Sequence, residues 1–267
     1  MMDLKQAAGT IEKYLRVHTR PIALKYFEKS EELPQNIRRP GMLGVKMAFC
    51  QINTIVRKWG WSFAVGPEDI NCVAALMSFG WGDLDENLDK TEELINFRIN
   101  AGYIKDRKTA IHNMEKTASL MNEKKFSAKG LVVSPLDSGT VENPDVILIY
   151  GNPAQMARMV QAMIYSEGGV IESWANMGAS CVREMIAPLI ENKAGYVIPG
   201  RGARQLGMAG DDEMVFTLPA KKLDSLLEGL KETHEKGTKY PINQFLFFEP
   251  MFNKTVEKLR EKIKLNP

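Results

Sequence analysis

Two unbroken apolar runs in the middle of the chain constrain its fold more than any other feature. Leu131–Val133 and Val146–Tyr150 carry no charged side chain, and each is too short for a typical helix. Strands that read as continuous apolar runs are usually those buried on both faces of a sheet. The two runs therefore predict a central sheet that is covered on both sides.

The segments around these runs alternate between helical and strand-like patterns. Apolar residues recur at helical spacing over 4–15, 153–163 and 223–230. Five further short segments predict strands: Pro21–Phe27, Trp61–Val65, Val170–Trp174, Tyr196–Ile198 and Met214–Leu218. Because the strands are unevenly spaced, a purely parallel doubly wound sheet is disfavoured. We therefore expect an α/β or α+β fold, a single domain with a mixed central sheet covered by helices.

The composition argues against several classes of protein. With 35 basic and 33 acidic side chains the net charge is only +2, whereas duplex-binding proteins need a concentrated cationic face. No window approaches the ~18 apolar residues of a membrane-spanning helix, and the first residues lack the apolar core of a signal peptide. Three cysteines fit a secreted disulfide framework poorly. We therefore expect a cytoplasmic protein that binds neither nucleic acid nor membrane, and a homo-oligomer is compatible with this composition.

Cys50, Cys72 and Cys181 are the residues whose chemistry could define a site. Taken singly, a free cysteine is usually a small buried apolar residue. Cys50 lies in a helix predicted over Val45–Lys58, whereas Cys72 and Cys181 each follow a turn at the start of a predicted helix. The positive end of a helix favours the thiolate form of cysteine. The set of three is therefore a better candidate site than any one of them alone.

Three thiolates that met in space could serve different chemistries. They could ligate an iron–sulfur cluster, such as [4Fe–4S] with three cysteine ligands, and leave the fourth iron to a substrate or another ligand. They could equally hold zinc in a site with three protein ligands. A nucleophilic cysteine would need a base, but the three histidines all lie on helices predicted at the surface. The chain contains no CxxC pair and no zinc-ribbon spacing that would choose between the metals.

An arginine-containing segment provides a second candidate site. In Gly200–Gly207, glycines can turn backbone N–H groups towards an anion, and Arg201 and Arg204 can clamp a carboxylate or phosphate. On pattern alone, a long hairpin loop with solvated arginines is the better explanation. Asn152 follows a buried strand, a position where ligands of α/β sheets bind, although it also fits a plain helix cap. We name Arg201, Gly202, Arg204 and Asn152 as candidate residues for binding a small anionic molecule.

The order of these features resembles the family called domain of unknown function 169. The resemblance covers about Leu4–Phe248, and it rests on the three cysteines and on Arg201-Gly202-Ala203-Arg204 followed by Asp211-Asp212-Glu213. It implies a soluble protein from a family found largely in anaerobic microbes, and it supplies no settled activity. The domain that it implies spans 4–248 and is followed by a C-terminal helical extension over 249–267.

These observations lead to two function hypotheses. The first is a redox-related protein, which need not be an enzyme, whose three cysteines bind an iron–sulfur cluster while Arg201 and Arg204 hold an anionic substrate near the open iron. The alternative is a non-catalytic small-molecule-binding or sensor module with no metal, in which the arginines recognise a carboxylate or phosphate. A zinc site ranks below both, because cysteine ligation without a nearby histidine usually indicates structural zinc.

Overall fold

A six-stranded sheet forms the centre of the protein in the computed structural model, which describes residues 3–82, 88–122, 128–176, 180–244 and 253–263. The strands are ordered β2-β3-β1-β4-β6-β5. In that order they comprise Phe63–Val65, Gly130–Pro135, Ile22–Phe27, Val146–Gly151, Met214–Pro219 and Gly195–Val197. The strands β3 and β4 contain the two apolar runs and are buried along their whole length, as predicted.

The direction of the strands differs from the predicted mixed sheet, because each pair of neighbouring strands is antiparallel. Strand β1 lies between β3 and β4, with Leu24 opposite both Val133 and Val146. These partners lie far along the chain from β1. The sequence of a strand therefore does not indicate whether its neighbour runs parallel or antiparallel to it. The predicted class, with helices covering one central sheet, is confirmed.

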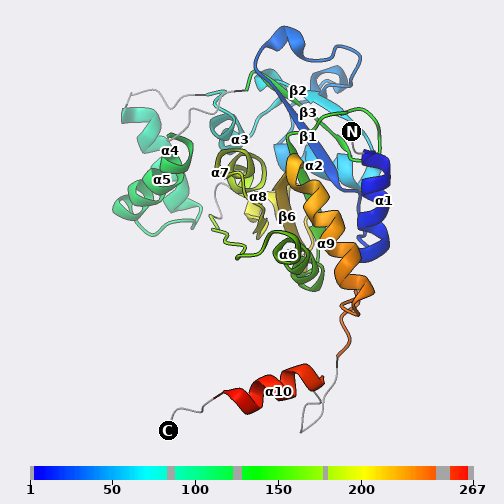
Figure 1. Ribbon diagram of the computed structural model, residues 1–267. Coiled ribbons are helices and arrows are strands. Elements are labelled where there is room, and N and C mark those ends of the chain that lie inside the picture. The colour runs from blue at the N-terminus through cyan, green and yellow to red at the C-terminus, as the bar shows by residue number, and fades with distance from the viewer. Residues whose placement is uncertain (1–2, 83–87, 123–127, 177–179, 245–252, 264–267) are drawn as a thin grey trace.

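Long regular helices cover one face of the sheet, which we call the regular face. They are α1 (Leu4–Leu15), α6 (Pro153–Glu167) and α9 (Leu223–Glu235), and Figure 1 shows α6 and α9 crossing in front of the sheet. Their apolar stripes pack on one set of alternate strand residues. A Cβ on Gly229 of α9 would lie only 2.0 Å from the carbonyl oxygen of Ala162 in α6. Glycine is therefore what lets these two helices approach so closely.

Short and irregular helices cover the opposite face, which we call the irregular face. The α-helical pieces are α2 (Phe49–Thr54), α3 (Val73–Ser78) and α7 (Ala187–Glu191), with α8 (Arg201–Gln205) beside α2. Two π-helical segments, Ile55–Trp59 and Val182–Ile186, continue α2 and precede α7. They pack on the other set of alternate strand residues, which includes Ile22 and Leu24 of β1.

Three of the described helices lie outside these two layers. Helices α4 (Leu88–Asn100) and α5 (Arg107–Asn122) contact each other and stand beside the irregular face in Figure 1. Helix α10 (Lys254–Lys262) is capped by Asn253 and buries none of its residues. The predicted boundary between 4–248 and 249–267 stays a prediction, and its vicinity lies outside the described residues. None of the described helices has the length and apolar character needed to cross a membrane.

The predicted strand Val170–Trp174 is wrong, because this segment forms no strand. Side-chain contacts hold it instead of a ladder of backbone hydrogen bonds, and the Ser173 hydroxyl donates to the Tyr196 carbonyl of β5. The guanidinium of Arg183 donates to the Ser173 hydroxyl at 3.0 Å and to the Glu172 carbonyl at 3.3 Å. A Cβ on Gly195 would lie 1.9 Å from this guanidinium, so β5 begins with a glycine that leaves room for it.

Candidate functional site

All three cysteines line one small cavity on the irregular face. The cavity measures about 70 Å³. Its lining includes Cys50, Cys72, Cys181, Asn53, Glu184 and Gly202, and we call it the cysteine cavity. The chain has three cysteines in total, and each is half-buried and free of disulfide bonds. Residues that are widely separated in the sequence are thus brought together by the fold.

Backbone hydrogen bonds place the start of α2 beside the start of α3. The Met47 N–H donates to the Asp69 carbonyl at 2.9 Å, and the Asn71 N–H donates to the Met47 carbonyl at 3.2 Å. This short parallel bridge holds the two chain segments together just before Cys50 and Cys72. Cys72 is the N-cap residue of α3, as the sequence predicted, and Cys50 lies in the first turn of α2.

Glu184 lies in the π-helical segment that precedes α7, and Cys181 is the N-cap residue of that segment. Pro188 has no N–H, and its ring crowds the carbonyl group four residues earlier, which is that of Glu184. That carbonyl accepts a hydrogen bond from the Thr217 hydroxyl on β6 instead. The proline therefore accounts for the wider turn, and Thr217 anchors it to the sheet. Such π-helical turns occur frequently at functional sites.

Helix α8 closes another side of the cavity. The Cys50 thiol donates to the Gly202 carbonyl oxygen, with 3.4 Å between sulfur and oxygen. A Cβ on Gly207 would lie 2.8 Å from the Cβ of Cys50, so a side chain at this position would push α2 and α8 apart. The segment Gly200–Gly207 is therefore a short helix and turn packed against α2, and the hairpin loop expected from its pattern is wrong. Gly202 is the candidate anion-binding residue that reaches the cavity.

Two of the thiols in the cavity, those of Cys50 and Cys181, are held in their neutral form. Burial, followed by the nearby Cys72 and Glu184, raises the pKa of the Cys50 thiol to about 11. Burial, followed by Glu184 and the other two cysteines, raises the pKa of Cys181 well above its usual range. The expectation that the end of a helix would favour a Cys181 thiolate is therefore wrong. Burial and nearby negative charge outweigh the helix dipole here.

Two polar residues of the cavity do not stand out in the sequence. Burial raises the pKa of Glu184 to about 7, although the positive charge of Arg57 acts in the opposite direction. Asn53 is 1% exposed, and its side-chain oxygen has no hydrogen-bond partner among the described residues. Each residue follows a cysteine by three positions, a spacing that puts both side chains on one face of a helix. The patterns Cys-x-x-Asn and Cys-x-x-Glu are the signals that could have identified them.

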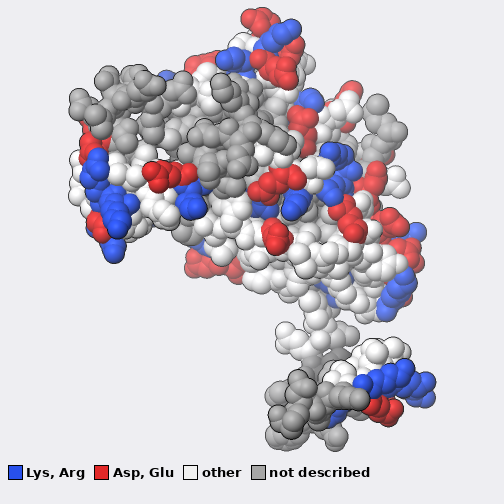
Figure 2. Space-filling model, turned by 60° about the vertical axis from the view of Figure 1, so that its left-hand side comes forward, with Lys and Arg blue, Asp and Glu red and all other residues white. Residues whose placement is uncertain are grey.

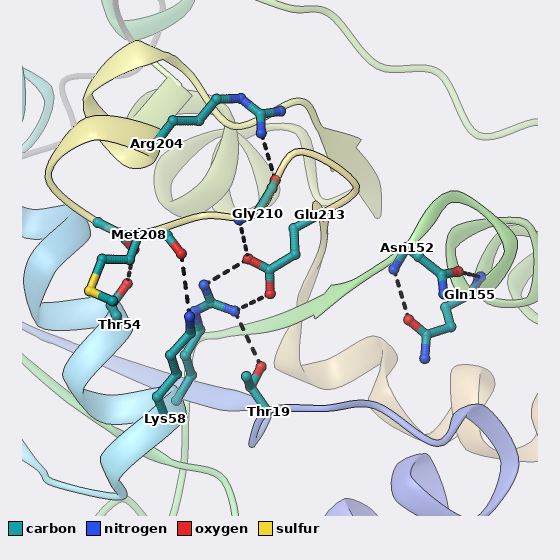
Figure 3. A network of polar contacts seen from close by, with 11 residues as sticks. Thr19, Thr54, Lys58, Asn152, Gln155, Arg204, Met208, Gly210 and Glu213 are labelled. Carbon is teal, nitrogen blue, oxygen red and sulfur yellow. Dashed lines mark hydrogen bonds and ion pairs between the residues drawn. The ribbon is translucent and has the colours of Figure 1, made fainter.

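A buried ion pair lies close to the cavity. Arg57 lies 4.1 Å above the ring of Tyr150 and forms two hydrogen bonds with the carboxylate of Glu213, one of them at 2.9 Å. Glu213 also accepts a hydrogen bond from the Gly210 N–H at 2.8 Å, and Figure 3 shows this network. Burial raises the pKa of Tyr150, and Arg57 and Asn53 offset part of that rise. Glu213, the last residue of Asp211-Asp212-Glu213, is thus the ion-pair partner of Arg57.

The two candidate arginines are bonded to the protein itself and do not line the cavity. Arg204 donates to the Gly210 carbonyl at 2.6 Å, which holds the turn that follows α8 (Figure 3). Arg201 donates to the Ala101 carbonyl at 3.0 Å and lies over the ring of Tyr103. It therefore connects α8 to the end of α4. An anion-binding role for either side chain stays a prediction.

Asn152 lies in a second pocket, which is separate from the cysteine cavity. It caps α6 by accepting a hydrogen bond from the Gln155 N–H at 2.9 Å, and its amide donates to the Tyr240 hydroxyl at 2.9 Å. This pocket measures about 170 Å³ and is also lined by His18 and Lys58. The structure therefore brings the three cysteines together with Gly202, and it places Asn152 elsewhere.

Among the described residues, no three His, Cys, Asp or Glu side chains stand close enough to one another to hold a single metal ion. The thiols surround a cavity and do not converge on one point.

On the face shown in Figure 2, basic and acidic side chains lie interspersed over the main body. That distribution agrees with the small net charge of the chain.

Comparison with known proteins gives a family without an assigned activity. A family model described as "Uncharacterised ArCR", domain of unknown function 169, matches residues 10–229. The uncharacterised protein MJ0308 of Methanocaldococcus jannaschii is 26% identical over 141 residues, which cover 52% of this chain and 58% of that protein. No solved structure matches. Because the family model spans most of the chain, including all three cysteines and the arginine segment, this protein belongs to the family of domain of unknown function 169.

Proposed function

We propose that this protein binds an iron–sulfur cluster of the [4Fe–4S] type through Cys50, Cys72 and Cys181, and that it serves a redox-related role. The observation that carries the proposal is that each cysteine of the chain lines the same cavity. The three come from different helices, and long-range contacts assemble them. A set of cysteines that served only as apolar filling would have no reason to line the same cavity.

The size of the cavity favours a small inorganic group over an organic ligand. Its volume is about 70 Å³, whereas pockets for organic ligands typically measure about 300–1,000 Å³. The metal-free sensor hypothesis places its ligand at the arginines, so the volume of this cavity does not test it. At the cysteines themselves, the volume supports a small inorganic group.

The electrostatics of the cavity point in the same direction. Three thiols and one carboxyl group share a small buried space, and the pKa values of Cys50, Cys181 and Glu184 are all raised. A bound metal has the opposite effect on the pKa of its ligands, because a coordinating thiol is deprotonated outright. Metal binding would release protons and neutralise groups that otherwise destabilise one another as anions.

A cluster fits the spacing of the thiols better than a single zinc ion does. Zinc needs each sulfur about 2.3 Å from one point. The described thiols instead stand around an open volume, and no group of three is close enough for one ion. A cluster places several irons between its cysteine ligands, so the cysteine sulfurs need not converge on one point.

An anionic ligand remains part of the proposal at the segment Gly200–Gly207. Gly202 touches the cavity, but Arg201 and Arg204 already bond to carbonyl groups of the chain. An anion would have to replace those contacts. Weaker binding of inorganic phosphate by Arg204→Ala than by the wild type would support this part, and equal binding would remove it.

Anaerobic purification tests the cluster directly. The full chain is reconstituted with iron and sulfide, and its visible absorption and its iron and sulfide contents are measured. We expect a brown protein with about four irons per chain, and Cys181→Ser should lose most of them. Ser180→Ala is the matched control, because Ser180 lines the same cavity without supplying a thiol. A colourless, iron-free wild-type protein would overturn the proposal, and zinc found instead by metal analysis would replace it.

A further inference from the structure

The cysteine cavity contains a carboxyl group from a buried residue, for which the described residues provide no hydrogen-bond partner. Glu184 is 4% exposed and lines the cavity together with the three thiols. Within the described part of the chain, no hydrogen bond or ion pair reaches its carboxylate oxygens. Burying an ionised carboxylate is costly unless it is paired or bound to a metal. Such a carboxyl group is therefore either protonated or bound to a cation.

The nearest candidate partner is already occupied. Arg57 acts on Glu184 only through its charge, since its guanidinium forms two hydrogen bonds with Glu213. The backbone of Glu184 is in turn held by the Thr217 hydroxyl on β6. The side chain is thus fixed in place at the cavity, and neither of these contacts neutralises it.

A second unsatisfied acceptor lies in the same cavity. The side-chain oxygen of Asn53 is buried and has no partner among the described residues. Buried polar atoms are normally hydrogen-bonded, so each exception calls for an explanation. Two acceptors without partners in one cavity indicate that the group that fills it supplies positive charge or hydrogen-bond donors.

We infer that Glu184 is the fourth protein ligand of the cluster held by Cys50, Cys72 and Cys181, and that its carboxylate binds the iron without a cysteine. This inference rests on the proposed function and adds to it the identity of the fourth ligand. Thiolate is the softer ligand and suits iron–sulfur clusters, whereas carboxylate suits harder metal ions. An external ligand must therefore displace the Glu184 carboxylate to reach this iron.

Cyanide is a suitable probe, because it binds to an iron that lacks a strong fourth ligand. Wild type, Glu184→Gln and Glu184→Cys are reconstituted anaerobically, and cyanide is titrated while the electron paramagnetic resonance of the reduced cluster is recorded. We expect Glu184→Gln to bind cyanide at least about tenfold more tightly than the wild type, the lower end of what even outer contacts contribute to metal sites. Glu184→Cys should resist cyanide at least as well as the wild type. Ser180→Ala is the control and should behave like the wild type.

The outcomes separate this inference from the proposal on which it rests. A wild-type protein without a cluster would remove both. A wild-type cluster that binds cyanide as tightly as that of Glu184→Gln would overturn the role of Glu184 alone. If the Gln variant holds no cluster, wild type and Glu184→Cys decide. If the clusters of both proteins resist cyanide, the inference is supported. If the wild-type cluster binds cyanide readily and that of Glu184→Cys does not, the inference is overturned.

Discussion

The two faces of the sheet are built from the same strands but differ in how their helices are made. On the regular face, α1, α6 and α9 are 12, 15 and 13 residues long and bury continuous apolar stripes. On the irregular face, five- and six-residue helices alternate with π-helical turns. The irregular face also holds more buried polar side chains, among them Asn53, Arg57, Arg183 and Glu184. All three cysteines lie there.

This difference indicates a division of roles. Regular helices let apolar side chains interlock at high density, which is the main source of stability in a folded domain. Short helices and π-helical turns aim individual side chains in directions that a regular helix does not allow. We infer that the regular face chiefly stabilises the domain, and that the irregular face chiefly positions the candidate site.

The largest effect is expected on the regular face. Leu226 of α9 is fully buried, so Leu226→Ala should lower the free energy of unfolding by about 2–5 kcal/mol. Urea unfolding followed by circular dichroism measures this loss. Leu259→Ala on the exposed α10 is the matched control and should change stability by less than about 0.5 kcal/mol. Equal effects of the two substitutions would contradict the role given to the regular face.

A somewhat smaller effect is expected from the ion pair of the irregular face. Although burial acts to raise it, hydrogen bonds from Arg57 and the Gly210 N–H hold the pKa of Glu213 below its usual value. Glu213→Gln leaves Arg57 buried without its counter-charge, so we expect a loss of up to about 3 kcal/mol at pH 7.

The pH dependence of this loss is a further check. Because the pKa of Glu213 is lowered by folding, its contribution is fully present above the unfolded value of about 4.3 and disappears as the pH falls through the folded value. The difference in unfolding free energy between wild type and Glu213→Gln should therefore shrink below about pH 4. A difference that stayed constant between pH 7 and pH 3 would show that the loss comes from packing instead of charge.

The smallest of the three effects is expected from Gly207→Ala. The added methyl group would meet Cys50 and the Ala203 carbonyl oxygen at 2.8 Å, so α2 and α8 must separate. We expect a loss of about 1–3 kcal/mol in unfolding free energy.

The same substitution displaces Cys50, so we also expect a lower iron content after reconstitution. Gly9→Ala in α1 is the control, since a Cβ there meets nothing within 4 Å and Gly9 does not line the cavity. An unchanged iron content in Gly207→Ala would indicate that the position of Cys50 does not matter for the site.

The cysteine site could be predicted from the sequence only in part. The start of a helix at Cys72 and at Cys181 followed from the turn residues before them, and both predictions are confirmed. The anion-binding role predicted for the arginine segment had less support. An arginine that binds a ligand and one that bonds to a nearby carbonyl look the same in the sequence. Arg204 and Arg201 do the latter. Glu184 was missed although it follows Cys181 by one helical turn.

The sequence by itself determined the layers of this protein and not the meeting of its distant parts. Periodic apolar spacing defined α1, α6 and α9, and unbroken apolar runs defined β3 and β4, because both patterns act within one element. Only the tertiary structure decided that the sheet is antiparallel, that Arg57 pairs with Glu213, and that Cys50, Cys72 and Cys181 share one cavity. Such contacts join segments far apart in the chain, so no local pattern of residues encodes them.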